Sequence, residues 1–246
     1  MVGARLVNVR MKKKVTICRC ASRQIMEAEN VAKMASSLQR AGYEVQVMPD
    51  LCALAEDEPA QLKALEGQTI VACHERAVRS LFNWRGVEPG VVMNLRTENI
   101  NQLAEKMGFA LEASEEEVEA FINQMKAFTV YQGTDAWFPV VDRKRCVDCG
   151  KCHDFGLFGV YSLDSDGKVQ VTTPHNCKNN CPACARTCPQ EAIIFPKHAF
   201  SPINGGENHE ENTLMIDATQ LYNQAFRERL TARRAGVALL KKNSMK

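Results

Sequence analysis

Short apolar runs alternate with amphipathic stretches along residues 15–130. The first run, 15–18, is short enough for a buried strand. Apolar residues between Val31 and Leu38 then recur at a spacing of three and four, which places them on one face of a helix. Gly42 follows, at the kind of position where helices commonly end. The pattern predicts a strand followed by a helix.

The same alternation continues through three further apolar runs, 45–48, 69–73 and 91–95. An amphipathic segment between the second and third of these runs ends at Gly86 and predicts another helix. Strands that alternate with helices are typical of βαβ units around a parallel sheet. We therefore predict an α/β domain with a parallel sheet over residues 15–132.

Two more helices are expected before the end of this domain. One begins near Glu98, and the other is opened by Ser114, with Glu117 three residues further on. A serine and a glutamate at this spacing form a capping box, in which each side chain bonds the other residue's backbone. Gly133 to Pro139 then has the composition of a linker.

Beyond the linker, residues 133–200 form a second predicted domain in which cysteines crowd together. The apolar runs 160–163 and 169–171 flank an Asp-Ser-Asp-Gly turn and predict a β-hairpin. We expect a small ferredoxin-like α+β iron–sulfur domain here. Such a segment has little apolar core, so a bound metal or cluster would help to stabilise it.

The two ends of the chain carry less information. Residues 1–14 are expected to be an N-terminal extension, and both Met1 and Met11 remain open as the start. Residues 201–246 are expected to form a polar, glycine-rich loop followed by a basic C-terminal helix from about 216 to 242.

Composition narrows the functional classes. The chain has 246 residues, of which 45% are hydrophobic and 24% charged, and its formal net charge is +2. This small charge gives no reason to expect nucleic acid as a partner. No apolar run approaches the roughly 20 residues that span a bilayer, and no export signal is visible, so we expect a cytoplasmic protein that does not cross the membrane. Eleven cysteines in such a chain favour metal or cluster ligation over disulfides.

Seven of these cysteines form two closely spaced runs. Thiolates separated by two residues on a tight loop can converge on one cubane, whose fourth ligand comes from a Cys-Pro in the other run. By that rule one [4Fe–4S] cluster is held by Cys146, Cys149, Cys152 and Cys188. Both runs, together with Ala192-Ile193-Ile194, resemble the bacterial-type two-cluster ferredoxins.

The second ferredoxin site is incomplete. Gly156 and Leu157 stand where the family's first run has its fourth cysteine and proline. The remaining cysteines of this site are Cys177, Cys181 and Cys184.

Three outcomes stay open for that site. It holds a [3Fe–4S] cluster, or a [4Fe–4S] cluster with a further ligand, or no cluster. The candidate non-cysteine ligands are His153, Asp154 and His175. A zinc site is a further alternative, because Cys146 and Cys149 with Cys181 and Cys184 also make a tetrahedral set.

Four more cysteines lie in the first half of the chain: Cys18, Cys20, Cys52 and Cys73. If the predicted strands form a parallel sheet, these cysteines lie at or just beyond the strand ends, the edge where α/β sheets bind ligands. The alternative is that each is a small buried apolar residue.

Residues 17–96 resemble the N-terminal domain of the heterodisulfide reductase A subunit. The resemblance rests on Ile17-Cys18-Arg19-Cys20, Leu51-Cys52, Val71-Ala72-Cys73-His74-Glu75, Gly86-Val87-Glu88-Pro89 and Asn94-Leu95-Arg96. It implies a [4Fe–4S] cluster on all four cysteines and a place in anaerobic metabolism. The chain departs from the family at Ala21 and at His74-Glu75. No G-x-G-x-x-G sequence follows a predicted strand, so neither FAD nor NAD is expected.

Taken together, these features predict an electron-transfer protein with one to three clusters. Its partners would be a redox protein that donates electrons and a larger oxidoreductase complex that accepts them. Catalysis by the chain itself is not expected. Two alternatives remain: an enzyme subunit that binds substrate at the three-cysteine cluster, and a regulatory or structural protein that contains clusters.

Overall fold

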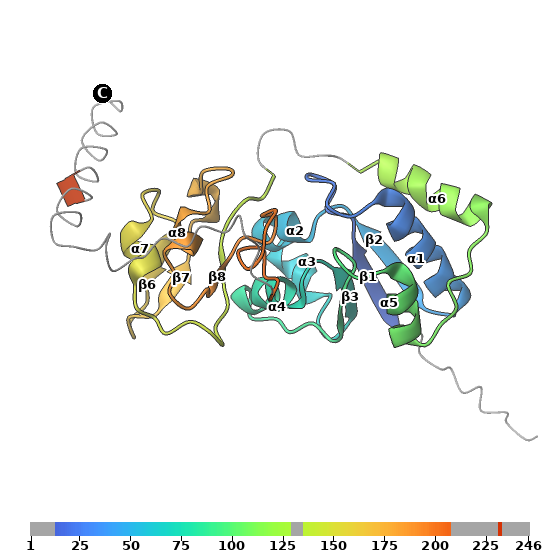
Figure 1. Cartoon of the computed structure of the whole chain (residues 1–246), viewed down its shortest axis with the longest axis horizontal. Coiled ribbons are helices and arrows are strands. Elements are labelled where there is room, and N and C mark those ends of the chain that lie inside the picture. Colours follow the sequence, from blue (N-terminus) through green and yellow to red (C-terminus); the bar gives the residue numbers. More distant parts are fainter. Residues whose placement is uncertain (1–12, 129–134, 208–230, 233–246) are drawn as a thin grey trace, which may run out of the picture. The chain divides into compact units, whose positions relative to one another are not determined.

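The computed structural model of the chain describes residues 13–128, 135–207 and 231–232 (Figure 1). The chain divides into two compact units, each made of several segments. The first contains Met1–Leu51, Ala64–Ala72 and Pro89–Val130. The second contains Cys52–Lys63, Cys73–Glu88 and Tyr131–Lys246.

The first unit is built on a parallel sheet of four strands, which confirms the predicted α/β fold (Figure 1). The strands lie in the order β2-β1-β3-β4. Their bounds are β1 Lys14–Cys18, β2 Glu44–Met48, β3 Thr69–Ala72 and β4 Val92–Asn94. Ile17 of β1 pairs with Val47 on one side and Val71 on the other. A central strand of a parallel sheet is covered on both faces, and all of β1 except Lys14 is buried.

Helices of the first unit follow the sequence signals closely. They are α1 (Ala28–Arg40), α5 (Ile100–Met107) and α6 (Glu115–Lys126). Gly42 beyond α1 has a φ of 87°, a left-handed conformation that glycine adopts at little cost. Ser114 and Glu117 form the predicted capping box, and Glu117 also accepts a hydrogen bond from Arg40 Nε at 2.7 Å. Thus α6 is capped at its start and joined there to the end of α1.

The second unit combines three helices with the cysteine-rich segment, which we define as residues 140–194. The helices are α2 (Leu51–Asp57, of which 52–57 belong to this unit), α3 (Pro59–Lys63) and α4 (Glu75–Trp84). The cysteine-rich segment contains β5 Val140–Val141, α7 Lys151–Phe155, β6 Tyr161–Leu163, β7 Val169–Val171, a 3-10 turn at Pro174–Asn176, α8 Ala183–Arg186 and β8 Ile193–Ile194. Strands β6 and β7 form the predicted antiparallel hairpin, and β5 pairs with β8, also antiparallel.

Helix α4 packs against the cysteine-rich segment, although the sequence placed it in the α/β domain. Trp84 Nε1 donates a hydrogen bond to Val171 O at 2.9 Å, and the Trp84 ring lies 5.0 Å from that of Phe138. Arg76 forms an ion pair of 2.9 Å with Asp142, and both side chains are largely buried. The predicted domain boundary between residues 132 and 133 divides the chain at a single point. The contacts instead group α4, which precedes that point, with the cysteine-rich segment. Independent folding on either side of that boundary stays a prediction.

Residues 201–206 form turns, in keeping with the predicted loop, but they are buried despite their polar, glycine-rich composition. A Cβ on Gly205 would lie 2.8 Å from Ala77 Cβ, and one on Gly206 would lie 2.1 Å from Ser201 Oγ. The glycines therefore allow this stretch to pack tightly against the start of α4.

The predicted extension 1–14 falls mostly outside the described residues, as does the C-terminal helix, of which only residues 231–232 are described and are helical. Within the described ranges, none of the helices combines the length and the apolar character needed to cross a bilayer.

Candidate metal centres

The four cysteines predicted to hold the first cluster come together in the second unit. Cys146, Cys149, Cys152 and Cys188 all line one small cavity, which Gly150 and Ala192 help to form. Cys152 and Cys188 are buried, Cys146 is half-buried and Cys149 is exposed. Cysteines from both runs thus meet at one cavity.

Local backbone conformation explains how the first run brings its three cysteines to one cavity. Asp148 and Gly150 have φ angles of 49° and 73°, so the chain turns through left-handed residues between the cysteines. The Asp148 N–H then donates to Cys146 Sγ at 3.4 Å, and the Ala192 N–H donates to Cys188 Sγ at 3.3 Å. Sulfur that accepts amide hydrogen bonds fits a thiolate ligand, and such bonds tune a cluster.

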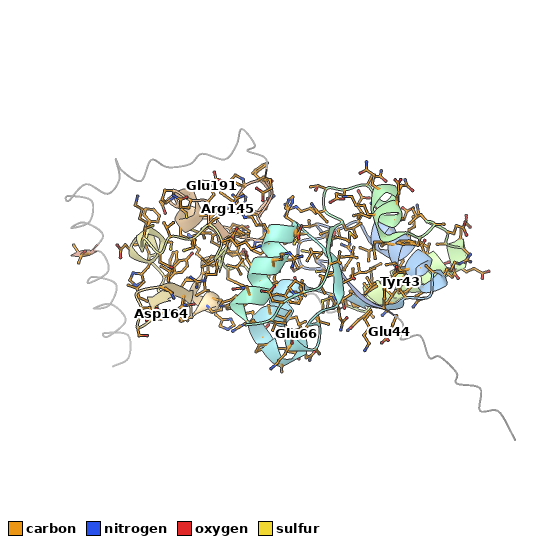
Figure 2. All side chains as sticks on the ribbon, turned by 90° about the horizontal axis from the view of Figure 1, so that it is seen from below. Tyr43, Glu44, Glu66, Arg145, Asp164 and Glu191 are labelled. Carbon is orange, nitrogen blue, oxygen red and sulfur yellow. The ribbon has the colours of Figure 1, made fainter. Side chains whose placement is uncertain are left out.

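Charged side chains fasten the two runs to each other (Figure 2). Arg145, which precedes Cys146, lies 3.5 Å from the Glu191 carboxylate and 3.8 Å from that of Asp142, and it also pairs with Glu207. Glu191 follows the Cys188-Pro189 pair along the chain. Arg145 therefore links the start of one run to the end of the other.

Burial affects the acidity of two thiols of this site. Burial raises the pKa of Cys152 above its usual range, and the neighbouring Cys184 and Cys188 raise it further. Burial also raises the pKa of Cys146. Buried thiols packed together lose their protons readily only when a cation offsets the accumulated negative charge. The donor set fits a metal or iron–sulfur centre for this reason.

The three cysteines of the second site also lie near one another. Burial raises the pKa of Cys177 to about 12, and Cys181 adds to the effect. Burial likewise raises the pKa of Cys184 to about 12, and both Cys177 and Cys181 contribute through their charge. The Tyr161 hydroxyl donates a hydrogen bond to Cys184 Sγ at 3.1 Å.

Each predicted non-cysteine ligand of the second site has another side-chain partner. His153 Nδ1 lies 3.2 Å from the carboxylate of Asp154. His175 Nδ1 lies 2.8 Å from the carboxylate of Glu56, whose side chain is only 8% exposed. Burial raises the pKa of Glu56, and the charge of His175 opposes that shift.

The zinc alternative receives less support from this geometry. The cavity contains Cys152 and Cys188 beside Cys146 and Cys149, and its lining does not include Cys181 or Cys184. The arrangement favours the ferredoxin-type ligand set.

The four N-terminal cysteines are divided between the two compact units. Cys18 and Cys20 belong to the first unit, whereas Cys52 and Cys73 belong to the second. Within the first unit, the Leu51 N–H donates to Cys18 Sγ at 3.3 Å, the same kind of bond that Cys146 and Cys188 accept. A cluster on all four residues stays a prediction.

All eleven cysteines lie within the described residues, and none of them forms a disulfide. Sequence reasoning missed Tyr161 and Glu56, which lie near the second site. No local signal could have found them, because their partners are set by the fold.

Comparison with known proteins finds relatives for about a quarter of the chain. A search of family models finds no match, and no solved structure matches the chain. Two uncharacterized ferredoxins of Methanocaldococcus jannaschii do match. The first is 45% identical over 62 residues, which are 25% of this chain and 42% of that ferredoxin. The second is 37% identical over 58 residues, which are 23% of this chain and 74% of that ferredoxin.

The chain belongs to the ferredoxin family.

The matched part of the chain is a ferredoxin-type iron–sulfur domain. The match covers about a quarter of the chain, and less than half of the first relative. The resemblance of residues 17–96 to heterodisulfide reductase stays a prediction.

Proposed function

We propose that this ferredoxin carries single electrons through a [4Fe–4S] cluster on Cys146, Cys149, Cys152 and Cys188. One observation carries the proposal: thiols from two separate runs line the same small cavity. A cluster with four thiolate ligands changes its iron valence without gaining or losing a ligand, and its surroundings set its potential.

The residues around this site would then have distinct tasks. Burial of Cys152 and Cys188 keeps water away from one side of the cluster. The amides of Asp148 and Ala192 stabilise negative charge on two ligand sulfurs. Cys149 is exposed, and its neighbour Val147 is 62% exposed, which makes this edge the natural place for electron exchange with a partner.

The remaining cysteines extend the proposal to a short electron-transfer chain. A second cluster would be held by Cys177, Cys181 and Cys184. A third would be held by Cys18, Cys20, Cys52 and Cys73, and it is supported by the ends of two paired strands. Cys18 is the last residue of β1, and Cys73 follows directly after β3 in the chain. The partners would be a low-potential donor and a larger oxidoreductase complex in the cytoplasm.

Anaerobic counts of iron and acid-labile sulfide on the purified chain test the first cluster. Cys188→Ser removes a ligand of the first cluster, so we expect it to lose about four iron and about four sulfide atoms per chain. Gln190→Ser is the control, because Gln190 lines the same cavity without offering a thiol. A colourless wild-type protein that contains one zinc per chain would overturn the proposal.

The same counts separate the N-terminal cluster from the first one. Cys52→Ser should remove iron while the cluster that depends on Cys188 keeps its EPR signal. Unchanged iron in Cys52→Ser would show that no cluster is held by the N-terminal cysteines.

A further inference from the structure

Gly156 occupies the chain position where the two-cluster ferredoxins have the missing cysteine of the second site. It follows α7 with a φ of −66°, so the backbone there would accept a side chain. The surroundings would not accept it easily. A Cβ at this position would lie 3.0 Å from Cys152 O and 3.4 Å from Cδ2 of the Tyr161 ring. The tight contact is with the Cys152 backbone, while the aromatic ring of Tyr161 lies at van der Waals distance from the position of the absent ligand.

Tyr161 also reaches the cysteines of the second site. It is the first residue of β6 and pairs with Val171 of β7, so the hairpin fixes its position. Its hydroxyl donates to Cys184 Sγ at 3.1 Å, and both residues are buried. A donor and acceptor that are both shielded from water interact strongly, and more so when the acceptor is a charged thiolate.

Geometry decides what this hydroxyl can do. Protein ligands of a cubane bind different irons at separate corners, so two ligand atoms do not lie within hydrogen-bonding distance of each other. The Tyr161 oxygen lies within that distance of Cys184 Sγ. It therefore acts as a hydrogen-bond donor to a ligand and not as a fourth ligand.

We propose that Tyr161 is a positioning residue that raises the reduction potential of a cluster held by Cys177, Cys181 and Cys184. The inference rests on the proposed function. One electron from the low-potential partner converts the oxidised cluster to the reduced cluster, and Tyr161 keeps its proton. The added negative charge spreads onto the thiolate sulfurs, so an O–H donor stabilises the reduced form more than the oxidised form.

The arrangement also bears on whether the second site transfers electrons or binds a substrate. A substrate would need access to the iron that lacks a cysteine ligand. Here the Tyr161 ring lies next to Gly156. Cys184, which accepts the hydrogen bond from the Tyr161 hydroxyl, is buried. The second site is therefore suited to passing electrons and poorly suited to binding a substrate.

Tyr161→Phe tests the proposal, because it removes the hydroxyl and keeps the ring next to Gly156. We expect unchanged iron and sulfide, an unchanged potential for the first cluster, and a lower potential for the second. A tenfold weaker equilibrium constant for reduction corresponds to a reduction potential lower by about 59 mV for a one-electron couple. The measurement is an anaerobic redox titration of the whole chain, followed by EPR.

Tyr43→Phe is the matched control. The Tyr43 hydroxyl donates to Met107 O at 3.3 Å in the first unit (Figure 2). Tyr43 precedes Glu44, which pairs with Lys14 at the start of β1, whereas Cys18 is the last residue of that strand. Removal of the Tyr43 hydroxyl should leave both potentials unchanged.

The outcomes distinguish the inference from the function on which it rests. Wild-type iron and EPR that show no second cluster refute the proposed function of that site. A second cluster that is present, with the same potential in wild type and Tyr161→Phe, overturns the inference alone.

If Tyr161→Phe loses the cluster, wild-type protein made with fluorotyrosine gives the answer. Fluorination makes the phenol a stronger donor, so the second potential should rise while the first stays constant. An unchanged second potential in that protein also overturns the inference.

Discussion

At the scale of single residues, thiol chemistry depends on burial and on neighbouring thiols. The pKa of both Cys177 and Cys184 is raised to about 12, mainly by burial. A raised folded-state pKa means that the fold favours the protonated thiol. Each such thiol contributes to the stability of the fold below the unfolded-state pKa of about 8.5, and this contribution is lost as the pH rises toward the folded-state pKa.

This sign gives a prediction for the chain from which the clusters have been removed. Between about pH 8.5 and 12, the free energy of unfolding should fall more steeply for wild type than for Cys184→Ala, which lacks one raised thiol. Urea unfolding at several pH values measures both slopes. Parallel slopes would show that the Cys184 thiol has an ordinary pKa in the fold.

Single residues also mark the limit of what the sequence predicts. The spacing of Cys146, Cys149 and Cys152 with a distant Cys188-Pro189 was sufficient to predict which thiols share a cavity. The contact of Tyr161 with Cys184 was not predictable, because it depends on the register of a hairpin and the position of α8. A tyrosine in a strand has no local feature that distinguishes a buried donor from an ordinary core residue.

At the scale of elements, the sequence predicted correctly those features whose backbone hydrogen bonds are made by residues close together in the chain. The capping box of α6, the left-handed glycine after α1 and the β6–β7 hairpin all follow from residues that are close in sequence. Residues 201–206 form turns, as a loop does, but the sequence did not predict their burial, because it comes from contact with α4. Composition reports the polarity of a segment, but it does not report which surface covers that segment.

The α6 capping box offers a test at this scale. Ser114→Ala removes the acceptor for the Glu117 N–H and should lower the free energy of unfolding by about 1 kcal/mol. Iron content should not change, since α6 contains no cysteine. Ser165→Ala, in the exposed turn of the hairpin, is the control and should stay within about 0.5 kcal/mol of wild type. Equal stability of the two variants would contradict the role of the cap.

At the scale of the whole molecule, chain order and spatial grouping differ. Residues 52–63 and 73–88 come before the linker in sequence, yet they group with the cysteine-rich segment. Periodicity predicted α4 as a helix after a strand, but long-range contacts determine its packing partner. The Arg76–Asp142 ion pair is the clearest such contact, because Cys146 N–H bonds to the backbone oxygen of Asp142.

Loss of this ion pair should therefore affect cluster retention as well as folding. Arg76→Ala removes the closest cation from the buried Asp142 carboxylate and leaves it Arg145 at 3.8 Å. We expect a loss at the lower end of about 3–5 kcal/mol in the free energy of unfolding. Iron should also dissociate faster from the first cluster, which can be followed by absorbance in the presence of a chelator. Arg79→Ala removes a surface pair with Glu75 on the same helix and should cost less than about 1 kcal/mol. Similar effects of the two variants would refute the role of the buried pair.

The close packing of residues 201–206 against α4 has a consequence for protein engineering. Gly205 and Gly206 lie against Ala77 and Ser201 with no room for a side chain. Cutting the chain after β8, where the residues that resemble a ferredoxin end, would uncover the start of α4. A fusion that joins this iron–sulfur domain to a redox enzyme should keep the chain through Glu207 and attach the enzyme beyond it.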